Sequence, residues 1–267
     1  MLKFSTRTLF VMVAIVAISY FFYTQFVLPA REKVCSMSCG SNLKQIGIGL
    51  LNYEYSFRSL PTSVETDAEG KLWRSWRSQI YPIFMESSSI FYDETTSWDS
   101  PTNRRLLNGT PIQMFSKDGS TYMTKIDRYP WTFNCPSCRE NNRKEINYVV
   151  VSGELTAFPK NRSVKLSGIT DGLDNTILVV ESITCRPDWT EPRDLEFDTM
   201  SFEINSKKGQ SISSLHLLGP LVCFADLGVY HISVKTTAGE LRAMLTVAGN
   251  ENVVRDDLIK RGVLIQY

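Results

Sequence analysis

The sequence predicts an α+β protein in which a long N-terminal helix packs on an antiparallel β-sheet, with small helices inserted. Three observations lead to this prediction. An apolar block occupies Leu9–Leu28, an apolar stripe with helical spacing runs from Cys39 to Phe57, and strand-like runs dominate after Pro111. The first part of the helix is expected to span a membrane and the second part to carry a folded head.

Composition and charge narrow the class of protein. Of the 267 residues, 43% are hydrophobic and 21% are charged, which is typical of globular proteins. Lys and Arg number 29 against 28 Asp and Glu, giving a net charge of +1. Nucleic-acid-binding domains are usually strongly basic, so no nucleic-acid partner is expected.

The apolar block at Leu9–Leu28 is about 20 residues long, or roughly 30 Å as a helix, which matches the hydrocarbon core of a bilayer. We therefore expect the lipid bilayer to be the partner of residues 9–28. A cleaved signal peptide and a buried soluble helix remain as alternatives. The candidate cleavage site after Ala30 follows an apolar run that is longer than a signal peptide's.

Charges flanking the block indicate its orientation. Lys3 and Arg7 precede the block, and Arg31 and Lys33 follow it. The charged amino terminus adds a third positive charge before the block, so the positive-inside rule slightly favours a cytoplasmic N-terminus. Six cysteines, enough for three disulfides, also favour an oxidising compartment for the rest. We expect a single-pass protein of the inner cell membrane, with residues 1–8 in the cytoplasm and residues 59–267 outside it.

Residues 29–58 are predicted to extend the same helix. The stripe residues are spaced by 4, 3, 4, 3 and 4 positions, and Leu60-Pro61 marks the end. Gly47 and Gly49 each cost about 1 kcal/mol of helix propensity, so packing must hold this segment helical. Packing on the protein's own head is the preferred interpretation, and homo- or hetero-assembly through residues 39–57 is the alternative. The stripe consists of Cys39, Leu43, Ile46, Leu50, Tyr53 and Phe57.

After the long helix, local signals predict two short helices and then a sheet. Ser75–Met85 reads as a helix interrupted near Pro82, and Ser100 caps a helix that begins at Pro101. A capping box at Thr237–Glu240 begins a late helix over 240–247. The expected strands are Ile112–Phe115, Tyr129–Phe133, Ile146–Ser152, Ile177–Ser182, Leu221–Ala225 and Val229–Val234, with a hairpin turn over Ala225–Gly228.

Cysteine spacing gives the main candidate for chemistry. Cys135 and Cys138 form a CxxC motif, which occurs in redox dithiols and supplies half of a zinc site. Neither histidine, His216 or His231, is near a cysteine pair in the sequence. We interpret the cysteines first as structural disulfides or buried thiols, with zinc binding by Cys135 and Cys138 and thiol redox chemistry as alternatives.

Other site patterns are weaker. Asp171 and Asp174 could supply oxygen ligands to calcium, but they lack the alternating ligand order of an EF-hand and fit turn chemistry better. A G-x-S-x-G nucleophile motif and a phosphate-binding glycine loop are both missing from the sequence. We therefore expect neither catalytic residues nor a cofactor.

Several short stretches, taken in order, resemble a large planctomycete family of pilin-like proteins that carries a domain of unknown function. The stretches are Cys39–Gly47, Ser75–Arg77, Trp98–Asn103, Cys135–Ser137, Ile169–Gly172, Asn175–Glu181, Phe224–Asp226 and Leu241–Ala243. The resemblance implies an architecture like that of a type IV pilin or type II secretion pseudopilin. No enzymatic activity is implied for any residue.

One departure from the pilin pattern lies at Phe4–Phe10. This stretch lacks the glycine of a prepilin processing site and the glutamate at the fifth mature position. We therefore expect a permanent anchor that prepilin peptidase does not process. The expected function is that of a membrane-anchored, pilin-like structural or interaction protein and not an enzyme. The alternatives are a tethered thiol-redox or zinc protein using Cys135 and Cys138, and an extracytoplasmic ligand-binding head.

Overall fold

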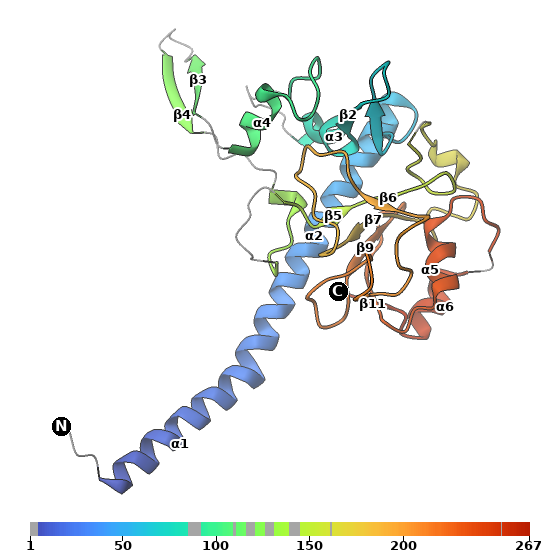
Figure 1. Cartoon of the computed structure of the whole chain (residues 1–267). Helices are drawn as coiled ribbons and strands as arrows, with labels where there is room; N and C mark the ends of the chain where they lie inside the picture. The colour runs from blue at the N-terminus through green and yellow to red at the C-terminus, as the bar shows by residue number, and fades with distance from the viewer. Residues whose placement is uncertain are drawn as a thin grey trace.

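The computed structural model of the chain describes residues 5–84, 92–108, 111–115, 121–125, 131–138, 145–160, 162–251 and 253–267. One long helix leaves a folded head and ends at the N-terminus (Figure 1). It runs over 52 residues as α1 (Thr6–Phe22), a π-helical turn η1 (Tyr23–Val27) and α2 (Leu28–Phe57). Arg58 ends it in the left-handed region with φ of 62°, three residues before Pro61.

Pro29 explains the π-helical turn. Proline has no N–H, and its ring would clash with the carbonyl group four residues earlier in an α-helix. The turn just before it is widened, and the N–H of Leu28 bonds to the carbonyl of Tyr23, five residues back. The helix therefore passes Pro29 without ending.

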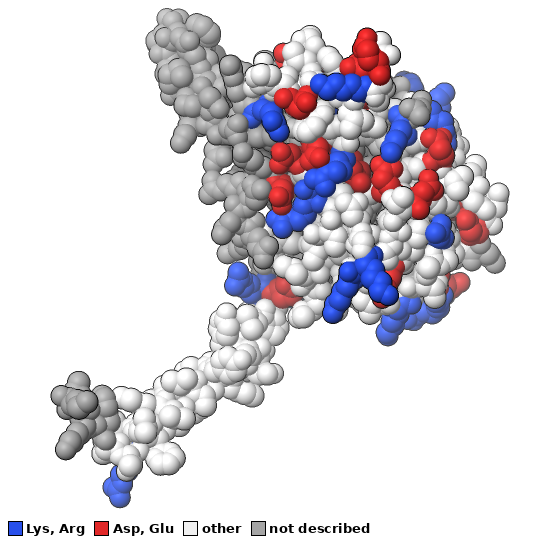
Figure 2. Space-filling view, in the orientation of Figure 1, with Lys and Arg blue, Asp and Glu red and all other residues white. Residues whose placement is uncertain are grey.

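The first part of the long helix is exposed along its whole described length. No residue of α1 is buried, and the stretch is long and apolar enough to cross a membrane. In Figure 2 it projects from the head as a largely white rod, whereas red and blue charged side chains are scattered over the face of the head that is shown. Burying one large apolar side chain is worth roughly 1.5–3 kcal/mol, so a dozen or more exposed ones amount to tens of kcal/mol in water.

The second part of the long helix packs against the head. Cys39, Leu43, Ile46 and Leu50 are fully buried, as the stripe predicted, and Tyr53 is partly buried. Phe57 is 64% exposed, so the prediction is wrong for this last residue, which lies at the end of the helix. The four buried residues lie against β7 (Ile177–Glu181), β9 (Leu221–Phe224) and β10 (Val229–Ile232). The preferred interpretation, packing on the protein's own head, is the one the structure shows for these side chains.

Gly47 permits a close approach between helix and sheet. A β-carbon at this position would lie 2.8 Å from Leu227 Cδ2 and 2.9 Å from Cys223 Sγ. The small residue that weakens the helix locally therefore lets the sheet and its hairpin approach the helix closely.

The central sheet has five strands in the order β11-β10-β9-β7-β5, all antiparallel to their neighbours. Its outer strands are β5 (Tyr148–Val149) and β11 (Leu264–Gln266). Every residue of β7 and β9 is buried, so both faces of the sheet are covered at its centre. Such strands read as continuous apolar runs, which is why they could be predicted.

The remaining elements surround this core. They are β1 (Val64–Thr66), β2 (Leu72–Ser75), α3 (Trp76–Phe84), α4 (Pro101–Asn108), β3 (Pro111–Phe115), β4 (Thr121–Lys125), η2 (Trp131–Phe133), β6 (Val151–Ser152), η3 (Leu166–Gly168), β8 (Leu195–Glu196), α5 (Ala238–Leu245) and α6 (Arg255–Lys260). Ser100 and Thr237 cap α4 and α5 as predicted, with both hydrogen bonds of the capping box present at α5. The hairpin between β9 and β10 is also confirmed.

Two strand predictions are wrong. The described end of Tyr129–Phe133 is a 3₁₀ turn in which Phe133 is buried and packs edge-on against Trp76 at 5.8 Å, so its apolar character reflects the core. Ile146–Ser152 is split at Val150, whose N–H donates to the Asp194 carboxylate at 3.1 Å. On either side, β5 pairs with β7 and β6 pairs in parallel with β8. The α+β class, a long helix on an antiparallel sheet, is confirmed.

Candidate metal centre

A row of side chains crosses the sheet face that α2 covers. Cross-strand partners share a face, and the register pairs Tyr148 with Glu181 and Leu221 with His231. Cys223, two residues after Leu221 and therefore on the same face, is the residue that approaches Gly47 of α2. The sheet therefore presents Tyr148, Glu181 and His231 to the long helix.

The helix presents its own polar residues to that row. Glu32, Ser36 and Cys39 are spaced by 4 and 3, so they lie on one helical face and continue the stripe toward the apolar block. Ser36 Oγ lies 2.6 Å from His231 Nε2, and Glu32 Oε1 lies 2.6 Å from His216 Nδ1. Cys39 reaches a second sulfur, that of Cys135.

Two turns bring in the remaining members. Cys135 lies in a turn closed by the Cys138 N–H, which donates to the Cys135 carbonyl at 3.0 Å. The N–H of Cys135 donates to the side-chain oxygen of Asn147 at 3.2 Å. His216 begins a turn closed by the Gly219 N–H, and a β-carbon at Gly219 would lie 2.2 Å from the Ile232 carbonyl oxygen. Only glycine fits there, where φ is 101°.

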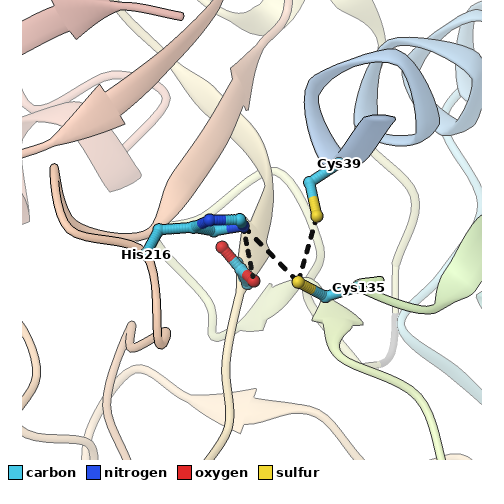
Figure 3. A group of neighbouring side chains, drawn as sticks. Cys39, Cys135 and His216 are labelled. Atoms are coloured by element: carbon cyan, nitrogen blue, oxygen red, sulfur yellow. Dashed lines mark hydrogen bonds and ion pairs between the residues drawn. The ribbon is translucent and has the colours of Figure 1, made fainter. Parts of the chain in front are cut away.

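The four side chains that meet are called the cluster below: Cys39, Cys135, Glu181 and His216. Their candidate ligand atoms all lie within 4.8 Å of one another, and all four residues are buried. The two sulfurs are 3.0 Å apart, Cys135 Sγ is 3.5 Å from His216 Nε2, and His216 Nε2 is 3.7 Å from Glu181 Oε1. Figure 3 shows Cys39, Cys135 and His216 pointing toward one another from separate segments.

Hydrogen bonds fix the tautomer of His216. A carboxylate only accepts, so the Nδ1–H of His216 donates to Glu32 and Nε2 faces the two sulfurs and Glu181. His231 differs because both of its nitrogens are used. Its Nδ1–H donates to the Gly219 carbonyl at 2.6 Å, so Nε2 accepts from Ser36.

The electrostatics of the cluster are strongly perturbed. The pKa of Cys135 is lowered by hydrogen bonds from Cys138, the larger cause, and from Cys39. The same hydrogen bonds with Cys135 raise the pKa of Cys39 and of Cys138. Burial raises the pKa of Glu181 well above its usual value, and Cys135 raises it further. Burial acts to lower the pKa of His216, but the bonds with Cys135 and Glu32 outweigh it and raise that pKa.

One oxygen of the Glu181 carboxylate has no hydrogen bond. Oε2 accepts from the Leu221 N–H at 3.1 Å, but Oε1 has no hydrogen-bond partner among the described residues. A buried polar atom left in this way is costly, and it commonly marks the place of an ion or a water. Chemically, the cluster can bind a metal ion, form a disulfide, or hold a thiolate next to an imidazolium.

The predicted site residues fall in different places. Cys135 belongs to the cluster, whereas its CxxC partner Cys138 only donates to it and is half-buried. All six cysteines lie in the described chain and carry free thiols, four of them buried. Asp171 accepts backbone N–H groups of Gly249 and Asn250 at 2.7 and 3.0 Å, which is turn chemistry, and Asp174 is exposed. The hydrogen bonds of Asp171 fit the favoured interpretation, and calcium binding, the weaker candidate, is not tested.

Four participants were not predicted from the sequence as site residues: Cys39, Glu181, His216 and Glu32. Glu32 did carry a signal, because Glu32 and Ser36 extend the 4-and-3 spacing of the stripe backwards by two steps. Glu181 ends an apolar run, where an acidic residue reads as a solvent-exposed strand end. Cys39, Cys135 and His216 meet only because the whole fold brings their segments together.

Comparison with known proteins agrees with part of the sequence interpretation. A family model described as "Protein of unknown function (DUF1559)" matches residues 29–239. The span includes α2 from Pro29 onward, all four residues of the cluster, and Glu32. Neither a curated protein nor a solved structure gives a significant match. The expected domain of unknown function is thereby confirmed.

Proposed function

We propose that this chain, which belongs to the DUF1559 family of proteins of unknown function, is a membrane-anchored structural or interaction protein. In this proposal it is pilin-like and is not an enzyme. The observation that carries the proposal is the division of the long helix. Its first part is apolar and wholly exposed, whereas its second part forms the core of the head. A helix divided in this way presents a folded head at a membrane surface.

A second apolar feature supports the same placement. Leu215, Leu217 and Leu218 are exposed on the turn that carries His216, and Leu217 is 81% exposed. This turn touches the long helix close to its apolar block, because the Leu217 N–H donates to Glu32 at 3.4 Å. Exposed leucines beside the membrane segment suit the boundary between headgroups and acyl chains.

The proposed topology has the N-terminus in the cytoplasm and the head outside it. The test is carbonate extraction of membranes, followed by protease treatment of intact spheroplasts and of lysed cells. We expect the full chain to stay in the membrane and the head to be digested in intact spheroplasts. Digestion only after lysis would overturn the orientation, and a soluble head lacking residues 9–28 would show that the block is a cleaved signal.

The interaction role concerns the outer face of α2. The stripe side chains Cys39 to Leu50 are buried, so a partner would meet the opposite face, where Val34, Met37, Ile48 and Tyr55 are exposed. A photocrosslinking residue at Ile48 should trap a second copy or another membrane protein in cells. The same residue at exposed Leu155 is the matched control. Monomer only from both positions would count against assembly through this face.

A further inference from the structure

We propose that Cys39, Cys135, His216 and Glu181 bind one zinc ion in a closed site that fastens the long helix to the sheet. Zinc–ligand bonds of 2.0–2.3 Å place the ligand atoms of a tetrahedral site about 3.3–3.8 Å apart. The separations of 3.5 Å between Cys135 Sγ and His216 Nε2 and of 3.7 Å between His216 Nε2 and Glu181 Oε1 lie within that range. The two sulfurs, at 3.0 Å, would move apart by roughly 0.8 Å, because Zn–S bonds of about 2.3 Å place them near the upper end of the range. Four buried ligands leave no open position, which is the arrangement of structural rather than catalytic zinc.

The donor set selects the metal. Two sulfurs and an imidazole nitrogen favour zinc over magnesium or calcium, which prefer oxygen ligands throughout. Binding replaces the protons of the two thiols with metal–sulfur bonds and transfers no electrons. The carboxylate of Glu181 completes the set through Oε1, the atom that has no hydrogen bond among the described residues.

The competing chemistry is a disulfide between Cys39 and Cys135. A disulfide would use the two sulfurs and leave His216 Nε2 and Glu181 Oε1 with only each other, 3.7 Å apart and beyond hydrogen-bond distance. Buried polar atoms without a hydrogen bond cost free energy whether the glutamate is charged or has taken up a proton. A zinc ion instead satisfies the sulfurs, the nitrogen and the oxygen at once, so the whole arrangement favours the metal.

Glu32 supplies the outer support that histidine ligands usually have. Metal-bound histidines commonly donate their second N–H to a carboxylate, which fixes the ring and its tautomer. His216 donates Nδ1–H to Glu32 in this way, with Nε2 facing the cluster. Glu32 is a positioning residue, and it lies on the same helix as the ligand Cys39.

The first test measures zinc in the full chain, purified in detergent without chelator. We expect one zinc per chain in the wild type and almost none in Cys39→Ser, Cys135→Ser or His216→Gln. Cys35→Ser, which removes a half-buried thiol one helical turn before Cys39, is the matched control and should keep the metal. Replacement by cobalt should give visible thiolate-to-cobalt charge-transfer bands, and their absence would contradict the ligand set.

A second test does not depend on removing a ligand, since those variants could fail to fold. Glu32→Gln should weaken zinc affinity by about 10–100-fold in a chelator competition. Ser36→Ala, one turn along the same helix, should leave the affinity unchanged. A metal-free wild type with a Cys39–Cys135 disulfide would overturn the proposal, as would loss of zinc in Cys138→Ser with retention in Cys39→Ser.

Discussion

At the scale of single residues, Arg77 is an unusual side chain because it is fully buried and charged. It pairs with Asp194 at 2.6 Å and donates to the carbonyls of Trp189, Glu191 and Arg193. Trp76 Nε1 donates to the same carboxylate at 3.1 Å. The stretch Ser75–Arg77, one of those that resemble the pilin-like family, therefore holds the loop of residues 189–194 against α3.

Replacing Arg77 should be costly. Arg77→Met leaves the Asp194 carboxylate buried without its charge partner, and we expect a loss of about 3–5 kcal/mol in unfolding free energy. The double variant with Asp194→Asn should lose less than the sum of the single changes. Arg193→Met, at a half-exposed pair with Glu191, should cost no more than about 1 kcal/mol. Near-UV circular dichroism during unfolding measures all four, and equal losses for Arg77 and Arg193 would contradict this account.

Asp226 gives a pH-dependent prediction. Burial acts to raise its pKa, but the hydrogen bonds from Arg255 and the Gly228 backbone outweigh it, so the pKa of Asp226 is lowered. A lowered folded-state pKa contributes stability above the unfolded value of about 3.9, and this is lost as pH falls through the folded value. The stability gap between wild type and Asp226→Asn should therefore be constant from pH 7 to pH 5 and shrink below about pH 4. Unfolding curves at each pH measure it, and a gap that widens in acid would contradict it.

At the scale of elements, the approach of helix to sheet at Gly47 can be tested against a second helical glycine. Gly47→Ala places a β-carbon within 3 Å of two side chains, so we expect a loss of about 1–3 kcal/mol despite better helix propensity. Gly239 in α5 has nothing within 4 Å of its β-carbon position. Gly239→Ala should therefore gain about 0.5–1 kcal/mol. Thermal unfolding compares the two, and a stabilising Gly47→Ala would show that the contact adapts.

Elements with strong local signals could be predicted, and those defined by pairing could not. The stripe from Cys39 and the capping box at Thr237 are patterns of residues three or four positions apart, so each can be recognised in the sequence alone. The strands β1, β2 and β11 are short, and their identity depends on a distant or irregular partner. The break at Val150 depends on the carboxylate of Asp194, which is 44 residues away. The cluster is the extreme case, since Cys39 and Cys135 are separated by 96 residues.

At the scale of the whole molecule, the zinc site joins segments that are remote in sequence, so its removal should loosen the junction of helix and head. We expect chelation to lower the melting temperature by about 2–4 °C for each kcal/mol of binding energy lost. Residues 29–38 should become protease-sensitive at the same time, while the sheet around β7 and β9 stays protected. Unchanged melting and digestion after zinc has been removed would show that the site contributes no stability.

If residues 9–28 span a bilayer, as proposed, the number of residues between Leu28 and the first contacts of α2 sets the height of the head above the lipid. A helix rises about 1.5 Å per residue, so Ser36, the first buried residue of α2, lies about 12 Å beyond Leu28. Glu32, where the leucine-bearing turn makes contact, lies about 6 Å beyond it, and each headgroup layer is about 5–7 Å thick. In the proposed anchored state the head therefore stands directly on the headgroups, with little clearance for tilting. A binding partner has access from the side or from above, but not from beneath.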